Sequence, residues 1–136
     1  MIKFTSETIG YINLFEQLSR ARVKDCYILR EGVLFIVHEG EAGKAIGKEG
    51  INIKKASMMI KKKIKVVEYS DDIIKFIENM IAPQKATIEK KDENTIMIEG
   101  RGARFKEAVL GRERQNLKEL QEIVSNYFSN IKIEVI

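Results

Sequence analysis

The chain has 136 residues, of which 44% are hydrophobic and 32% charged, and its formal net charge is +4. This balance is typical of a folded protein and excludes wholesale disorder. A single cysteine and a single histidine exclude an intramolecular disulfide and the usual set of zinc ligands. Because no apolar run reaches the roughly 20 residues that span a bilayer and no signal peptide is recognisable, we expect a soluble, cytoplasmic protein without a membrane partner.

Apolar periodicity in the first half predicts a helix, two strands, a glycine-interrupted segment, a helix and a strand. Thr5 or Ser6 is placed to cap the first helix, and Glu31 and Gly32 form the turn between the first two strands. The expected ranges are a helix over 9–18, strands over 23–29 and 33–37, a helix over 51–63 and a strand over 64–66.

The second half repeats this order of elements. We expect Ser70 to cap its first helix and Pro83 to end it. The expected ranges are a helix over 73–81, strands over 86–89 and 95–99, helices over 101–110 and 117–127, and a strand over 131–135. The methionines at 58, 59 and 80 are predicted to fill the core.

The two halves differ in charge. Residues 1–69 carry 13 Lys and Arg against 8 Asp and Glu, whereas residues 70–136 carry 11 against 12. The excess of positive charge in the first half favours a polyanionic partner. Because no Gly-, Ser- or Pro-rich spacer separates the halves, we predict an α+β protein of two domains, 1–69 and 70–136, packed against each other.

The segment Gly47-Lys48-Glu49-Gly50 carries the clearest chemical signal. Two glycines bracket two polar residues between two helices, and glycine has no Cβ to obstruct a ligand. The helix that follows presents free N–H groups that suit a phosphate, and Lys44, Lys48 and Lys54 add positive charge. The same pattern also fits a helix–turn–helix corner in which glycine only relieves strain.

A second copy of the motif lies 64 residues later, where Gly111 corresponds to Gly47. The further matching pairs are Lys48 with Arg112, Glu49 with Glu113, Asn52 with Asn116 and Lys54 with Lys118. Arg114, however, occupies the place of the second glycine. A bulky residue there either blocks close approach of a ligand backbone or reaches a phosphate itself, and a corner retained only for packing is equally open.

With the element order α-β-β-α-α-β, the first loop resembles the GXXG loop of type II KH domains, which clamps the backbone of about four nucleotides. Two such domains in 136 residues, with Gly-Glu-Ala-Gly-Lys-Ala-Ile-Gly-Lys-Glu-Gly at the first loop, resemble the archaeal NusA-like family of transcription termination and antitermination factors. The resemblance implies single-stranded RNA as a partner and a contact with RNA polymerase. Glu49 departs from the family, in which this position often carries a small or neutral residue.

We therefore predict that the first loop clamps RNA, that the bases face the groove beside the strand over 33–37, and that the second domain extends the surface. The expected RNA-binding residues are Lys44, Gly47, Lys48, Glu49, Gly50, Asn52, Lys54, Arg101, Arg104, Gly111, Arg112, Arg114, Gln115, Asn116 and Lys118. A ribosome-linked KH protein and a protein-interaction scaffold without RNA binding are the alternatives. We expect no enzyme, because no catalytic constellation, cofactor motif, metal site or small-molecule site is recognisable and the glycine spacing breaks the Walker A pattern.

Overall fold

The computed structural model describes residues 5–136. Within it the chain forms two compact units, one ending at Ser70 and the other running from Asp71 to Ile136. The boundary expected from the sequence lies one residue earlier. None of the helices in residues 5–136 is both long and apolar enough to cross a membrane.

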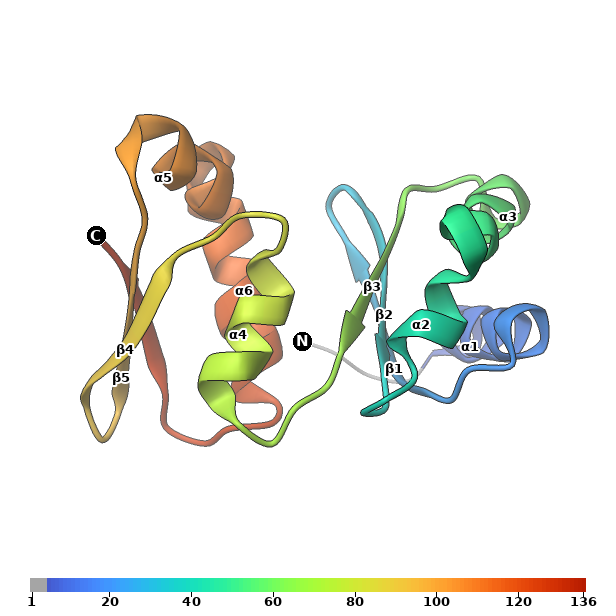
Figure 1. The fold of residues 1–136 in the computed structure, drawn as a ribbon, viewed down its shortest axis with the longest axis horizontal. Helices are drawn as coiled ribbons and strands as arrows, with labels where there is room; N and C mark the ends of the chain where they lie inside the picture. Colours follow the sequence, from blue (N-terminus) through green and yellow to red (C-terminus); the bar gives the residue numbers. More distant parts are fainter. Residues whose placement is uncertain (1–4) are drawn as a thin grey trace. The chain divides into compact units, whose positions relative to one another are not determined.

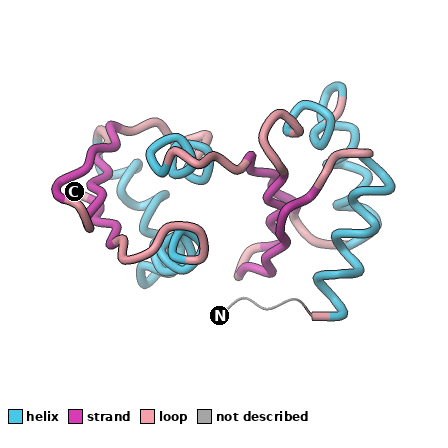
Figure 2. The backbone as a smooth tube through the Cα atoms, turned by 90° about the horizontal axis from the view of Figure 1, so that it is seen from below, coloured by secondary structure: helices cyan, strands magenta, loops and turns pink. Residues whose placement is uncertain are grey.

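The first unit packs three helices on one face of a three-stranded sheet, as both Figure 1 and Figure 2 show. The strand order is β1-β2-β3, with β1 antiparallel and β3 parallel to the central β2. Phe15 of the first helix stacks on Phe35 of β2, with ring centroids 4.4 Å apart. The elements are α1 (Ser6–Ser19), β1 (Val23–Leu29), β2 (Gly32–Val37), α2 (Ala42–Ile46), α3 (Ile51–Ile60) and β3 (Ile64–Glu68).

The second unit repeats this arrangement, with strand order β4-β5-β6 and the same strand directions. Ile96 and Ile98 of β5 and Ile123 of the last helix are fully buried, and Phe76 meets Tyr127 edge-on at 5.5 Å. The elements are α4 (Ile73–Ile81), β4 (Thr87–Asp92), β5 (Thr95–Glu99), α5 (Gly102–Leu110), α6 (Gln115–Ser125) and β6 (Lys132–Val135). The expected α-β-β-α-α-β order is thus confirmed in both units.

The helix starts show one confirmed cap and one wrong prediction. Thr5 caps α1 through a reciprocal pair of hydrogen bonds with Thr8, in which each hydroxyl accepts from the other residue's N–H. For α4, however, Asp72 and not Ser70 is the cap, because its Oδ1 accepts from the N–H of Ile74 at 3.0 Å. A carboxylate at this position also matches the positive end of the helix dipole.

The helix predicted over 51–63 is three residues shorter. It ends at Ile60, because Lys61 takes a left-handed conformation with φ 62°. The carbonyl of Lys63 then accepts a hydrogen bond from Val33 N–H at 2.8 Å, so this residue already runs beside the start of β2. The lysine-rich segment 61–63, which we predicted as the end of the helix, therefore leads into the sheet instead.

For two of the three methionines, the predicted place in the core is wrong. Met80 is 8% exposed, as expected, but Met58 and Met59 are 78% and 60% exposed. The reason lies in the faces of α3, because Ala56 is the residue that this helix buries, while Ile53 packs against the core. The two methionines lie on the opposite, outer face.

Candidate nucleic-acid interface

The turn between α2 and α3 is built around Gly47. Its φ of 78° and ψ of 170° fall in a region that is essentially restricted to glycine. A Cβ added there would lie 2.8 Å from Asn52 Nδ2, which is closer than real Cβ contacts. The N–H of Gly47 bonds to the carbonyl of Gly43, and the N–H of Gly50 to that of Gly47. Both conformation and space therefore demand glycine at this position.

Asn52 joins the two helices across the turn. Its Nδ2 donates to the backbone carbonyl of Lys44 at 2.9 Å, so a residue in the first turn of α3 satisfies a carbonyl of α2. We predicted Asn52 as an RNA contact, but the structure shows its amide nitrogen holding the loop in shape. The RNA contact of Asn52 stays a prediction beside this observed role in holding the loop.

The second loop has the same backbone. Gly111 has φ 71° and ψ 178°, and Glu113 has φ 55° and ψ 29°, against 56° and 26° at Glu49. Asn116 joins the helices of the second loop as Asn52 does those of the first, since its Nδ2 donates to the carbonyl of Ala108 at 3.1 Å. The correspondence at an offset of 64 residues thus extends from the letters of the sequence to torsion angles and a hydrogen bond.

Arg114 adopts the left-handed conformation that the second glycine has in the first loop. Its φ and ψ are 60° and 23°, against 74° and 19° at Gly50. A Cβ added at Gly50 would meet nothing within 4 Å, so a side chain at this position projects into open space. The replacement changes what the loop displays and leaves the course of its backbone intact.

The first loop presents exposed charge. Lys44, Lys48 and Lys54 are all exposed, as is Glu49. Lys44 Nζ lies 3.8 Å from Glu41 Oε2, so part of its charge is balanced within its own helix turn. The structure places no ion-pair partner beside Lys48 within residues 5–136. Lys48 is therefore the cation of the loop that is best placed to meet a phosphate.

We predicted that bases face the groove beside the strand over 33–37, and this stays a prediction. Val33, Phe35 and Val37 of this strand lie in the core beneath the helices and are at most 1% exposed, so these three side chains are not available to a base. The exposed apolar side chains at the loop are instead Ile46, which is 36% exposed, and Ile51, which is 43% exposed. Ile46 and Ile51 directly flank the two glycines. Their place at the end of α2 and at the start of α3 is a sequence signal that our prediction did not use.

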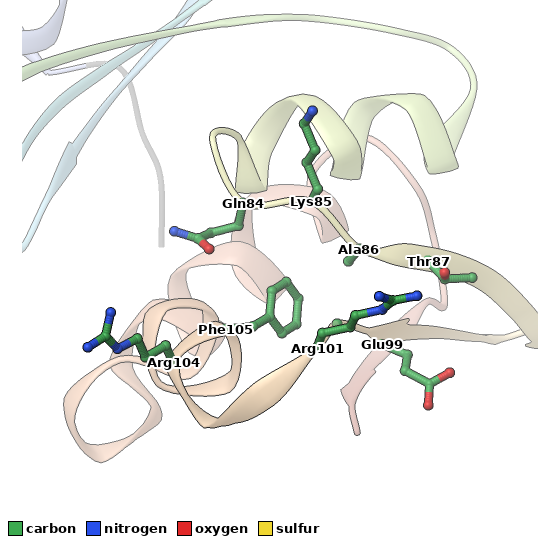
Figure 3. A pocket seen from close by; sticks show the side chains of 9 residues that line it. Gln84, Lys85, Ala86, Thr87, Glu99, Arg101, Arg104 and Phe105 are labelled. Carbon is green, nitrogen blue, oxygen red and sulfur yellow. The ribbon is translucent and has the colours of Figure 1, made fainter.

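Arg101 and Arg104 do not join the second loop. They lie at the start of α5, whereas the loop follows its end, about 13 Å further along the axis. They line a separate hollow of about 720 Å³. Figure 3 shows their guanidinium groups on different sides of Phe105. The other lining residues are Gln84, Lys85, Ala86, Thr87, Glu99 and Gly100. None of these residues had been predicted to bind a ligand, because a Lys or Thr next to a strand carries no signal in the sequence.

The side chains that ordinarily carry metal or redox chemistry form no such site in the described part of the chain. Within residues 5–136 no group of three His, Cys, Asp or Glu side chains is placed to hold a metal ion. Cys26 is buried in β1, and burial, reinforced by the nearby charge of Asp25, raises the pKa of its thiol to about 12. Its role is that of a small core residue.

Comparison with known proteins shows the family to which the chain belongs. A profile of the KH domain family matches residues 10–80. Proteins named probable transcription termination protein NusA are similar over nearly the whole chain. The relative from Methanocaldococcus jannaschii is 34% identical over 99% of this chain and 75% of its own length. The one from Thermoplasma acidophilum is 28% identical over 98% and 95%.

A solved structure is also similar to this chain over nearly its whole length. The crystal structure of APE1850 superposes with a TM-score of 0.73 at 28% identity, covering 98% of this chain and all of that one. A relative from Methanococcus vannielii with the same name is 34% identical over 97% of this chain and 79% of its own length. The chain therefore belongs to the KH-domain family, among the archaeal NusA-like proteins.

Proposed function

We propose that this chain binds single-stranded RNA and acts in transcription termination, antitermination or elongation. The observation that carries the proposal is the Gly47–Gly50 turn between α2 and α3, with Lys48 and Glu49 exposed between its glycines, in a chain that belongs to the KH family. KH domains hold the sugar-phosphate backbone of about four nucleotides at such a loop. The role in transcription is taken from the relatives, which are named transcription termination proteins.

In the mechanism that we propose, the RNA backbone lies against the first loop. Gly50 leaves open space where a Cβ would stand, and Lys48 supplies a cation that forms no ion pair within residues 5–136. Glu49 weakens the local potential without cancelling it, because Lys44 and Lys54 lie on the two flanking helices. Bases then pack on the exposed side chains beside the glycines, and no step requires a cofactor or bond cleavage.

We propose that residues 1–69 and 70–136 are separate KH domains and that the second one binds RNA differently. Arg114 stands where a backbone would otherwise approach, so its loop offers a cation in place of an open surface. Arg112, Gln115, Asn116 and Lys118 surround it in sequence and extend the proposed surface. The groove that holds Arg101 and Arg104 is a separate part of this surface, at the opposite end of α5.

A binding titration tests the first loop. A fluorescent single-stranded RNA of about ten nucleotides is titrated with wild type and with Lys48→Glu, with anisotropy recorded at several salt concentrations. We expect the variant to lose about tenfold in affinity and its slope of log K against log salt to become shallower by about 0.7, the value for one phosphate contact. Lys75→Glu makes the same charge change on an exposed residue of α4 and is expected to bind as wild type does. Equal losses in both variants, or none, would refute the clamp.

The pathway is tested separately from RNA binding. If the chain acts in transcription, it is expected to co-purify with RNA polymerase from cells and to change the position of termination in a reconstituted reaction. Co-purification with ribosomal particles instead would favour the ribosome-linked alternative. Binding to a protein that is insensitive to salt, with no RNA bound, would favour an interaction scaffold.

A further inference from the structure

The outer face of α3 carries apolar side chains that the fold does not use. Met58 and Met59 are 78% and 60% exposed, while Ala56, on the inner side, is buried and Ile53 packs with the core. A helix that only had to cover the sheet would expose polar residues here. In Figure 1 this helix (green) is the one that follows the first loop.

Lysines surround the two methionines. Lys55 lies three and four residues before Met58 and Met59, which makes the three side chains neighbours on a helix surface, and Lys61 and Lys62 follow the end of α3. We call these five residues the Met58 face: Lys55, Met58, Met59, Lys61 and Lys62. The three lysines are exposed, and no Asp or Glu occurs between residues 50 and 67.

This composition fits a protein better than a nucleic acid. Recognition of unpaired bases relies on stacking against aromatic rings or arginine planes, and the Met58 face has neither. Phosphate contacts alone need only the lysines and leave two large apolar side chains without a role. Methionine, by contrast, is favoured at surfaces that bind apolar residues of a protein partner, because its side chain adapts to their shape.

We propose that the Met58 face docks an acidic amphipathic helix of a protein partner. The methionines receive the apolar stripe of that helix, and the lysines face its carboxylates. Met58 lies about 10 Å along α3 from Ile51, the residue beside the first loop at which this helix begins. This inference is independent of RNA binding, since it uses none of the residues assigned to the loop.

Methionine methyl groups report directly on this face. The protein is labelled with ¹³C-methyl methionine and titrated with a synthetic helix of about 18 residues, long enough to be helical, with leucine at core spacing and glutamate elsewhere. We expect the resonances of Met58 and Met59 to shift while that of Met80, which is buried in the second unit, stays in place. Unmoved resonances, or equal shifts with a peptide in which lysine replaces every glutamate, would overturn the proposal.

Matched variants separate the apolar from the charged contribution. Met58→Gln combined with Met59→Gln is expected to weaken peptide binding about tenfold, and Lys55→Glu combined with Lys62→Glu by at least as much. Both pairs replace exposed residues, so unfolding is not expected, and a circular dichroism melt checks this. Met97→Gln, on a partly exposed methionine of β5, is the control and leaves binding unchanged.

An RNA titration of the methionine pair distinguishes the two kinds of ligand. If the face docks protein, Met58→Gln with Met59→Gln binds the RNA of the loop experiment within about twofold of wild type. A loss of RNA affinity that matches the loss of peptide affinity would assign the face to RNA and overturn the proposal. A failure of the loop mechanism shows itself in Lys48→Glu, and the peptide titration, which involves no RNA, then decides the proposal by itself.

Discussion

Replacing the two glycines of the first loop by alanine, one at a time, tests the account of its geometry. At Gly47 the backbone region costs a residue with a Cβ about 1–3 kcal/mol. The new Cβ also displaces Asn52, whose hydrogen bond to the Lys44 carbonyl contributes about 1 kcal/mol. Alanine also restricts the unfolded chain more than glycine does, which offsets about 0.4–1 kcal/mol of this loss of stability. We therefore expect the free energy of unfolding to fall by about 2–3 kcal/mol.

At Gly50 the same substitution is expected to cost less. The backbone is left-handed, with φ 74° and ψ 19°, but a Cβ there meets nothing within 4 Å. The left-handed conformation costs about 1–2 kcal/mol and the unfolded chain returns part of it, which leaves a net loss of about 1 kcal/mol. The costs of the two substitutions are thus predicted to differ by about 1–2 kcal/mol. The reason is that a new Cβ meets the Asn52 side chain at Gly47 but meets nothing within 4 Å at Gly50.

Urea denaturation followed by circular dichroism measures both variants. A double-mutant cycle with Asn52→Ala then isolates the steric part. When Asn52 is already truncated, Gly47→Ala is expected to cost about 1 kcal/mol less, because the displaced hydrogen bond is gone. Equal costs at Gly47 and Gly50, or a Gly47→Ala cost that does not depend on residue 52, would refute this description of the loop.

Substitutions at three further positions test the second unit and the core. Arg114→Gly relieves a left-handed arginine at the expense of a more flexible unfolded chain, and a net gain of about 0.5 kcal/mol in the urea experiment is expected; a clear loss would contradict the strain at this residue. Asp72→Ala removes the cap of α4 and is expected to cost about 1 kcal/mol, with Asp72→Asn close to wild type. The Cys26 thiol has its pKa raised by burial to about 12, so only the unfolded chain loses this proton between about pH 9 and 12. Stability is therefore expected to fall across that window by up to about 1.4 kcal/mol per pH unit, and this component is absent in Cys26→Ala.

The sequence was sufficient for the order of elements and for both loops, for identifiable reasons. Apolar residues at spacings of two and of three to four distinguish strands from helices when one face is buried, as with Ile96 and Ile98. The glycine pattern located the first loop because the backbone conformation of Gly47 is essentially restricted to glycine. The offset of 64 residues located the second loop, even though Arg114 breaks the pattern.

The failures arose where several residues compete for one role. Ser70 and Asp72 are both good caps, and only the actual start of α4 decides between them. Met58 and Met59 were placed in the core because they are apolar, but a helix ten residues long buries a single face, and Ala56 defines it. The distance between the second loop and Arg101 depends on how a whole helix separates them, which a basic stretch of sequence does not reveal.

The two loops show how one backbone can support two chemistries. Their torsion angles agree closely and each is held by an asparagine that donates to a carbonyl eight residues earlier. Since the frame is shared, any difference in ligand binding must come from the side chains that it displays. The decisive position is the last one of the turn, where Gly50 leaves space and Arg114 fills it with a cation. Retaining the strained backbone at Arg114 therefore argues that the shape of this loop matters in the second unit as well, because a corner needed only for packing has less strained alternatives.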